Sequence, residues 1–284
     1  MTRDRRTTDD TCPSTGAGRP QTMDPERDPT PAPLVGWASR TRSPGGTEVD
    51  SRCYWWSAGM RQITWSLLGN ERGRLLDVGC GPGWGQAEQP RGVWAAGLDR
   101  AGHLVDRRPS LLYRPTTQAP LGSRRPFVQA DAGMIPFRAG AFDLVLALDL
   151  LEQQGVNPEM ALKEIRRVLR PGGRLLARVP AHPWLYGPHD REWGGARRYR
   201  RAELRALIQG AGFSVRRLTY ANSLIFPLAA LVRLGGRAGL LRDDLLWLAE
   251  PFGGFLLGLL RSEARWLRKR DLPAGLSLVC LAEA

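Results

Sequence analysis

The sequence predicts an α/β fold with a doubly wound, mostly parallel β-sheet, and three observations lead to it. A short apolar run at 75–78 leads directly into a loop with glycine at every second position from 79 to 85. This pattern is typical of a buried parallel strand that ends where the backbone approaches a ligand closely. Two further short runs, at 93–99 and 127–131, each end in an aspartate. An amphipathic helix is predicted at 158–169, as expected where helices connect parallel strands.

The glycine loop narrows the class of ligand. A dinucleotide fingerprint beginning at Gly79 would need glycine at position 84, where the chain has Trp84. A phosphate-binding P-loop would need Gly-Lys-Ser/Thr, which is absent from the loop. Asp77 stands two residues before the first glycine. Because a carboxylate attracts a cationic amine and repels a pyrophosphate, the loop fits S-adenosylmethionine, which has an amine and a sulfonium but no phosphate, better than NAD or ATP.

Local signals mark the ends of the other predicted elements. Asn157 and Pro158 form an N-cap with proline in the first turn, and the Pro-Gly-Gly at 171–173 ends that helix. Gly210 and Gly212 end a later helix. The elements expected in chain order are a helix from about 53 to 68, strands at 75–78, 93–99, 127–131 and 142–148, a helix from 158, a strand at 174–179, a helix at 201–209, and strands at 214–220 and 276–284.

Three segments are predicted to lie outside these elements. Residues 1–48 are rich in Pro, Thr, Asp, Arg and Gly and show almost no apolar periodicity. We therefore expect a disordered tail followed by one domain at 49–284. The segment at 86–91 is short and contains Pro90, so its helix is expected to be frayed. The proline-rich segment at 107–125 is expected to be a surface loop.

Composition limits the compartment and the partners. The 284 residues carry a formal charge of +13, almost entirely from arginine, since Lys163 and Lys269 are the only lysines. Such a charge suggests an acidic partner, but a GC-rich coding sequence produces the same arginine bias. The four cysteines have neither disulfide-framework nor zinc-site spacing, so no metal is expected. Without an apolar signal segment at its start, the chain is expected in the cytoplasm.

Taken together, these motifs resemble class I S-adenosylmethionine-dependent methyltransferases, the methyltransferase domain family, over roughly residues 54–213. The resemblance is carried by RLLDVGCGPGWG, VWAAGLD, FVQADAGMIPF, AFDLVLALDLLEQ and LKEIRRVLRPGGRLLARVP, which occur in the family's order. It implies a seven-stranded sheet with strand order 3-2-1-4-5-7-6 and strand 7 antiparallel. A helical insertion at 222–272 would then lie between strands 6 and 7. The family's cofactor is S-adenosyl-L-methionine.

The resemblance also implies which residues contact the cofactor. They lie in the glycine loop and at the ends of the following strands, and Asp99 matches the acid that binds the ribose hydroxyls. Many relatives have Asp-Val-Leu-Glu-His after strand four, where this chain has Gln153 in place of the histidine. The expected cofactor-binding residues are Asp77, Gly79, Cys80, Gly81, Gly83, Asp99, Arg100, Asp131, Ala132 and Leu148.

Catalytic candidates are expected in the loop after strand five. Methyl transfer is an in-line attack on the sulfonium methyl that needs proximity and alignment, and an oxygen nucleophile also needs a base within hydrogen-bond reach. Ligands of open parallel sheets bind outside the carboxyl ends of the strands. The loop at 182–198 holds His189, Asp190, Tyr186 and His182, of which His189 with Asp190 is the leading acid/base pair. Alternatively, the two histidines hold the loop through backbone hydrogen bonds.

The insertion at 222–272 bears on the acceptor. Apolar residues recur there at helical spacing with arginines between them, yet no stretch reaches the ~18–20 uncharged apolar residues needed to span a bilayer. The insertion could be a lid over an apolar pocket, a surface resting on an anionic membrane, or additional core or dimer helices. We rank a small hydrophobic or lipid-linked acceptor first. Peripheral contact with the inner face of the membrane is the accompanying alternative for localisation.

Two other functions remain open. The positive charge and the arginine-rich run at 197–201 raise the possibility of an RNA methyltransferase. The run could bind a phosphate or carboxylate, or it could simply be the solvated start of a helix. Against nucleic acid, the sequence shows no separate RNA-binding module and no Asn-Pro-Pro-Tyr-type motif after strand four. The altered second helix and Gln153 leave a non-catalytic, cofactor-binding member as the third alternative.

Overall fold

The computed structural model describes residues 40–42, 48–50, 55–69, 72–81, 93–100, 127–237 and 252–284 of the 284-residue chain. Strands β1 (Arg40–Arg42) and β2 (Glu48–Asp50) pair antiparallel at the end of the predicted tail. The rest of that tail, Gly83, the segment at 86–91 and the loop at 107–125 lie outside the described residues.

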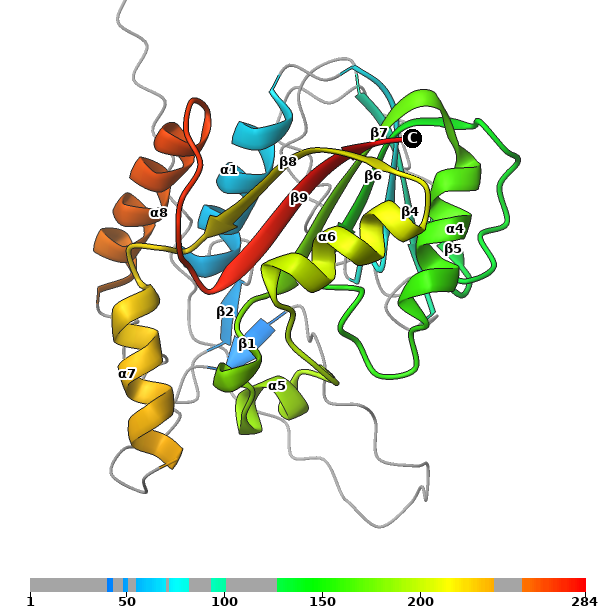
Figure 1. Cartoon of the computed structure of the whole chain (residues 1–284). Coiled ribbons are helices and arrows are strands. Elements are labelled where there is room, and N and C mark those ends of the chain that lie inside the picture. The colour runs from blue at the N-terminus through cyan, green and yellow to red at the C-terminus, as the bar shows by residue number, and fades with distance from the viewer. Residues whose placement is uncertain are drawn as a thin grey trace, which may run out of the picture. The chain divides into compact units, whose positions relative to one another are not determined.

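The central sheet has the predicted topology. Its strands are ordered β5-β4-β3-β6-β7-β9-β8, which is 3-2-1-4-5-7-6 when these seven are numbered along the chain. All neighbours from β5 to β7 pair parallel, and β9 pairs antiparallel with both β7 and β8 (Figure 1). The strands are β3 (Gly73–Val78), β4 (Val93–Asp99), β5 (Phe127–Gln129), β6 (Phe142–Leu148), β7 (Leu169–Pro180), β8 (Ser214–Ala221) and β9 (Ser277–Glu283).

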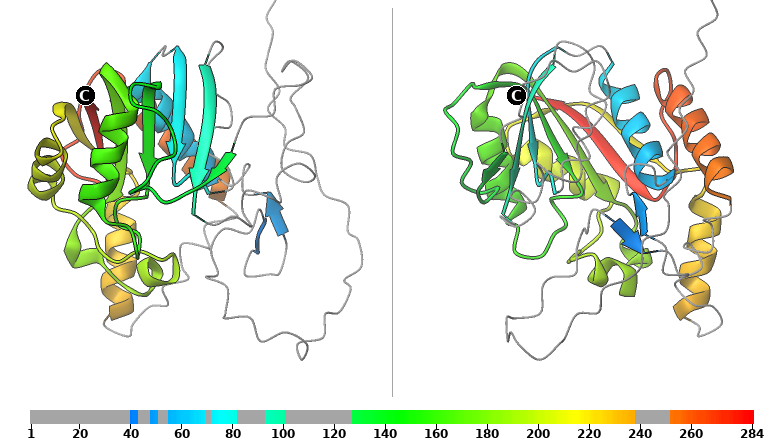
Figure 2. Two further views of the ribbon diagram at one scale, coloured as in Figure 1. Left: turned by 90° about the vertical axis from the view of Figure 1, so that its right-hand side faces the viewer. Right: turned by 180° about the vertical axis from the view of Figure 1, so that it is seen from behind.

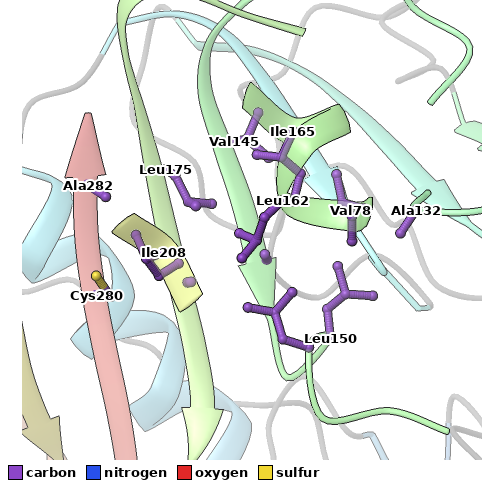
Figure 3. Close-up of a cluster of buried hydrophobic side chains, with 14 of the residues drawn as sticks. Val78, Ala132, Val145, Leu150, Leu162, Ile165, Leu175, Ile208, Cys280 and Ala282 are labelled. Carbon is purple, nitrogen blue, oxygen red and sulfur yellow. The ribbon is translucent and has the colours of Figure 1, made fainter. Parts of the chain in front are cut away.

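Helices cover both faces of this sheet. Helices α4 and α6 lie on one face and α1 and α8 on the other (Figures 1 and 2). Leu75 joins the hydrophobic cluster on the α1 side and Leu76 the cluster on the α4 side, which is why β3 is a continuous apolar run. Figure 3 shows the α4-side cluster. The helices are α1 (Trp55–Leu68), α4 (Pro158–Val168), α5 (Pro188–Glu192), α6 (Arg201–Gly210), α7 (Phe226–Arg237) and α8 (Gly253–Leu267), with a 3-10 turn η2 (Pro183–Leu185).

Most predicted element boundaries are confirmed, with two differences in length. The N-cap of α4 is as predicted, because Asn157 Oδ1 accepts a hydrogen bond from Met160 N at 2.9 Å. Strand β7 begins at Leu169, so the Pro-Gly-Gly lies inside the strand and the helix ends before it. Leu169 pairs with Phe142 across a register shift. Strand β5 ends at Gln129, two residues before the predicted end at Asp131.

The predicted insertion forms α7 and α8. Leu256, Leu260 and Leu267 of α8 are buried against α1 and the sheet. Glu263, also buried in α8, accepts hydrogen bonds from the backbone N–H groups of Asn222, Ser223 and Leu224 just before α7. The insertion is therefore bonded into the domain at both helices. Within the described residues, no helix combines the length and the apolar character needed to cross a membrane.

Candidate functional site

The loop after β3 is hydrogen-bonded to the end of β4. Because β3, β4, β6 and β7 are parallel, their carboxyl ends lie at one edge of the sheet. Gly79 N and Cys80 N both donate to Leu98 O, at 2.8 and 3.0 Å. Gly81 N donates to Asp99 Oδ2 at 2.8 Å. The carboxylate predicted to bind a ribose is thus held at the mouth of the glycine loop.

Two glycines of this loop have different steric surroundings. Gly79 has φ +72°, and a Cβ there would lie 2.8 Å from Leu150 Cδ1, so only glycine allows the loops after β3 and β6 to pack together. Gly81 has φ +50°, and a Cβ there would meet no described atom within 4 Å. Among the described residues, the position that a Cβ at Gly81 would take is therefore unoccupied, and the backbone N–H of Gly81 is bonded to Asp99.

The predicted adenine-side residues lie at the end of β5. Asp131 Oδ1 accepts from Gly133 N at 2.7 Å and closes a turn. Its Oδ2 lies 3.9 Å from Arg100 Nη1, which also donates to Gly155 O at 3.3 Å. The side chain of Ala132 packs into the hydrophobic core. These contacts connect the ends of β4, β5 and β6.

A buried charged cluster lies between the ends of β3, β6 and β7. Arg178 donates from both Nε and Nη2 to the carboxylate of Asp149, the residue after Leu148, with an Nε–Oδ1 distance of 3.0 Å. Burial, the largest single cause, lowers the pKa of Arg178, but the hydrogen bond and charge of Asp149 together with the charges of Glu152 and Asp77 raise it by more, so the guanidinium stays charged. Asp77 is 2% exposed and adds a negative potential at Arg178.

Glu152 is the second acid of this cluster. Its side chain is 4% exposed, and within the described part of the chain its Oε2 has no hydrogen-bond partner. Burial raises the pKa of Glu152 well above its ordinary value, and the charge of Asp149 acts in the same direction. Sequence reasoning missed Glu152 and Arg178 as site residues. An arginine inside the apolar run of β7 is the signal that could have revealed Arg178.

The contacts of Asp190 favour an anchoring role over the predicted acid/base role. Its Oδ1 accepts from Arg198 Nε at 2.9 Å and Nη2 at 2.7 Å. Its Oδ2 accepts from Gly187 N at 2.9 Å and from Arg233 Nη1 at 3.0 Å. Although burial raises the pKa of Asp190, hydrogen bonding and the charge of Arg198 lower it by more. A buried carboxylate held as an anion by two arginines is a poor proton acceptor.

The other three catalytic candidates differ in their surroundings. Tyr186 donates its hydroxyl to Gly195 O at 3.0 Å, and the ring of His189 lies 5.9 Å from that of Trp193. Neither contact points to proton transfer. His182 has φ +63°, and within the described residues its Nε2 has no hydrogen-bond partner. Of the four candidates, His182 best retains a ring nitrogen for chemistry.

The ring of His182 is held between two aromatic side chains. It stacks on Tyr220 of β8 at 5.4 Å and on Phe226 of α7 at 5.1 Å between centroids. Burial lowers the pKa of His182 by more than a backbone hydrogen bond at Gly275 raises it, and the positive charge of Arg198 acts in the same direction as burial. The imidazole is therefore neutral at neutral pH, the form in which a ring nitrogen can accept a proton.

Helix α7 is fixed to this loop by an ion pair that the sequence did not reveal. Arg233 Nη1 donates to Leu185 O and to Asp190 Oδ2, both at 3.0 Å. In Figure 1, α7 lies beside α5, beyond the carboxyl ends of the strands. Through Arg233 and Phe226, helix α7 therefore contacts the loop that holds the catalytic candidates.

Among the arginines of the run at 197–201, Arg198 is buried, whereas Arg197, Arg200 and Arg201 are exposed. Arg198 is 6% exposed and also donates to Ala181 O at 3.0 Å. Arg197 lies over the ring of Tyr199 at 4.3 Å, and Arg201 donates to Leu218 O at 2.7 Å. In the described ranges, no group of three His, Cys, Asp or Glu side chains is placed to hold a metal ion.

Comparison with known proteins agrees with this geometry. Residues 76–177 match the family model described as "Methyltransferase domain". A similar protein is the 27-O-demethylrifamycin SV methyltransferase of Amycolatopsis mediterranei (strain S699), 34% identical over 104 residues, covering 36% of each chain. Another is the demethylmenaquinone methyltransferase of Beutenbergia cavernae, 35% identical over 140 residues, covering 45% of this chain and 52% of that protein. The chain thus spans about half or less of these curated relatives.

A solved structure shares the fold over more of the chain. The [4+2]-cyclase SpnF superposes with a TM-score of 0.51 at 21% identity, covering 83% of this chain and 84% of that one. At this identity the similarity concerns the fold alone, and a shared fold does not fix the reaction.

The Asp190 anchor predicts a large loss of stability on neutralisation. Asp190→Asn leaves Arg198 buried without its counter-charge, so we expect a loss of about 3–5 kcal/mol in the free energy of unfolding, measured by urea denaturation at pH 7. Because the pKa of Asp190 is lowered, its contribution is present above the ordinary aspartate value of about 3.9 and is lost as pH falls through the folded-state pKa.

Asp271→Asn is the matched control for this prediction. Asp271 pairs with Arg217 near the surface, with its side chain 49% exposed, so its loss should cost about 1 kcal/mol or less. Equal losses in the two variants, or equal sensitivity to acid, would contradict the anchoring role of Asp190.

Proposed function

We propose that this chain, whose residues 76–177 belong to the methyltransferase domain family, transfers a methyl group from S-adenosyl-L-methionine to a small hydrophobic or lipid-linked acceptor. The observation that carries the proposal is the edge where β3, β4, β6 and β7 end, where Asp99 is bonded to Gly81 and no described residue occupies the Cβ position of that glycine. In the proposed organisation, a tail at 1–48 precedes a domain at 49–284 whose insertion at 222–272 borders the acceptor.

The chain's own residues supply position and charge on the donor side. S-Adenosylmethionine supplies an electrophilic methyl group on a sulfonium. Asp99 would bind the ribose hydroxyls, and the backbone at Gly79 and Gly81 would follow the cofactor closely. Asp77 and Glu152 provide negative potential for a cationic ligand, and the orphaned Oε2 of Glu152 supports this fit. Holding donor and acceptor in line is the main catalytic contribution that such a site makes.

On the acceptor side, we assign the proton-accepting role to His182. Its ring is neutral at neutral pH and is held rigidly by Tyr220 and Phe226, as a positioned base should be. Trp184 and Phe226, whose ring centroids lie 6.4 Å apart, add apolar surface beside it. These neighbours favour a hydrophobic acceptor. The relatives' names refer to demethylrifamycin and demethylmenaquinone as the molecules methylated.

A second candidate is a member that binds the cofactor without catalysing methyl transfer. The observation that favours it is Gln153, which stands where many relatives have a histidine. The RNA alternative loses support, because Arg198 of the arginine-rich run is buried in an ion pair with Asp190.

Peripheral membrane contact would bring a lipid-linked acceptor to the site. Helix α7 exposes Leu228, Leu231 and Leu234, and Leu224 just before the helix is also exposed, between 47% and 64% each; we call these four residues the α7 stripe. The only acid of α8, Glu263, is buried, whereas Arg261 and Arg265 of that helix are exposed. Exposed apolar side chains together with exposed arginines suit an anionic lipid surface.

The most direct test of the function follows labelled methyl from S-adenosylmethionine into a cell extract. We expect label in the organic-soluble fraction, and none with Asp99→Ala, because the ribose contact would be lost. Label in RNA would contradict the proposed acceptor. Absence of transfer despite measured donor binding would favour the non-methylating alternative.

Gly81→Ala tests the donor position. Its methyl group would enter a position beside Asp99 that no described residue occupies, so we expect calorimetry to show at least tenfold weaker S-adenosylmethionine binding, or about 1.4 kcal/mol. Gly69→Ala is the matched control, because Gly69 also has positive φ (+72°) and no described atom near its Cβ position. Both changes should cost about 1–2 kcal/mol of stability. Equal donor affinities would contradict the assignment.

Vesicle sedimentation tests the membrane contact. Leu228→Glu with Leu231→Glu should abolish binding to vesicles containing phosphatidylserine, because the carboxylates would oppose both burial and the surface charge. Met160→Glu on α4, where Met160 is 50% exposed, is the control and should bind like the wild type. Failure of the wild type to bind these vesicles would contradict the proposal.

A further inference from the structure

Glu152 is a buried carboxyl group, and the proposed methyl transfer does not use it to donate or accept a proton. Its side chain is 4% exposed, and in the described part of the chain Oε2 accepts and donates no hydrogen bond. Its backbone carbonyl has a partner, since Ala196 N donates to Glu152 O at 2.7 Å. A buried polar atom without a partner costs free energy in the absence of a compensating ligand, so its retention needs an explanation.

The charged and titratable groups facing Glu152 come from three elements. Asp149 lies in the same loop after β6, Arg178 on β7, and Tyr199 in the segment before α6. Tyr199 is buried, donates to Leu151 O at 2.7 Å, and has a pKa raised to about 12 by burial, so it stays neutral. Asp77 of β3 acts on the same arginine. One guanidinium therefore faces three carboxyl groups.

Arg178 is already engaged by the strongest of these partners. Its Nε and Nη2 both bind the carboxylate of Asp149, which leaves Glu152 without a cation of its own. Burial and the negative charge of Asp149 favour the neutral acid. They outweigh the hydrogen bonds from its own backbone and from the Gln153 side chain and the charge of Arg178, so the pKa of Glu152 is raised.

The segment that contains Glu152 packs against the glycine loop. Leu150, two residues earlier, packs so closely on Gly79 that a Cβ there would lie 2.8 Å from Leu150 Cδ1. Asp77, two residues before Gly79, is buried at the end of β3. A ligand that follows the glycine loop therefore brings its cationic groups to the edge of the cluster that contains Glu152.

We propose that Glu152 is a proton-linked part of the donor site, which is protonated in the empty protein and releases its proton to solvent when the cationic donor binds. This inference rests on the proposed function, because it takes S-adenosylmethionine as the ligand. The step is an ionisation of the carboxylic acid to a carboxylate and a solvated proton. No bond of the donor changes, and Glu152 acts as a binding residue, distinct from the base assigned to His182.

Calorimetric titration with S-adenosylmethionine at pH 7 tests the proton release. The titrations are made in phosphate and in Tris, which have different ionisation enthalpies. If the wild type releases a proton on binding, the buffer takes it up, and the binding enthalpies observed in the two buffers should differ. Glu152→Gln mimics the neutral acid, so it should bind the donor at least tenfold more weakly and with the same enthalpy in both buffers. Glu283→Gln changes a half-buried glutamate that is paired with Arg216, and this variant should behave as the wild type.

The outcomes separate this inference from the proposed function. Donor binding by the wild type without proton release, or with equal release by Glu152→Gln, would overturn the role of Glu152 alone. Absence of donor binding would overturn both.

A ligand-free measurement checks the starting protonation state. An acid with a raised folded-state pKa contributes stability that is present below its ordinary value of about 4.3 and is lost as pH rises toward the folded-state pKa. Across that window, Glu152→Gln should therefore gain stability relative to the wild type in urea denaturation. A difference that does not change with pH would show that Glu152 is already ionised, and would overturn the inference.

Discussion

The parallel pairing of β4, β3, β6 and β7 is the constraint on which the rest of the structure depends. Each of these strands is buried on both faces, so its peptide groups must find their hydrogen bonds within the sheet. The register places Val78 opposite Ala147 and Ala147 opposite Ala177, and the chain therefore leaves all of these strands at the same edge. Polar residues cannot be placed inside the apolar layers, so the charges of the domain collect where the strands end.

That collection of charge gives the edge its selectivity. The carboxylates of Asp77 and Asp149 outnumber the single guanidinium of Arg178, and Asp99 adds a carboxylate at the mouth of the glycine loop. Such an edge attracts a ligand with an ammonium or a sulfonium and repels one with phosphates. Across the sheet edge, the insertion contributes Phe226 and Arg233 to the loop that holds His182. One side of the candidate site is thus electrostatic and the other aromatic.

Sequence alone predicted what local patterns encode. The limits of β4 and β6 and the N-cap of α4 could be read because apolar runs and capping residues are close together in the chain. The contacts that define the acceptor side could not be predicted in this way, because they join residues far apart in the chain. Asp190 and Arg233 are 43 residues apart, and no periodicity links them, so the ion pair that holds Asp190 could not be predicted.

The position of Glu152 was visible in the sequence, but its burial was not. The motif around it predicted a turn after a strand, and only the packing of Leu150 on Gly79 places it against the cluster. In the same way, Asp131 was expected at the end of β5, yet the strand ends at Gln129 because the chain turns through the Asp131–Gly133 bond. Tertiary contacts decided each of these cases.

The central claim is that this edge of the sheet selects a cationic, phosphate-free nucleoside ligand. Parallel calorimetric titrations of the wild-type protein with S-adenosylmethionine and with NAD⁺ test it most directly. The account predicts saturable binding of S-adenosylmethionine and no measurable binding of NAD⁺ at the same concentrations. Binding of NAD⁺ with equal or higher affinity would contradict it, because the carboxylates at the strand ends would then not control which ligand is bound.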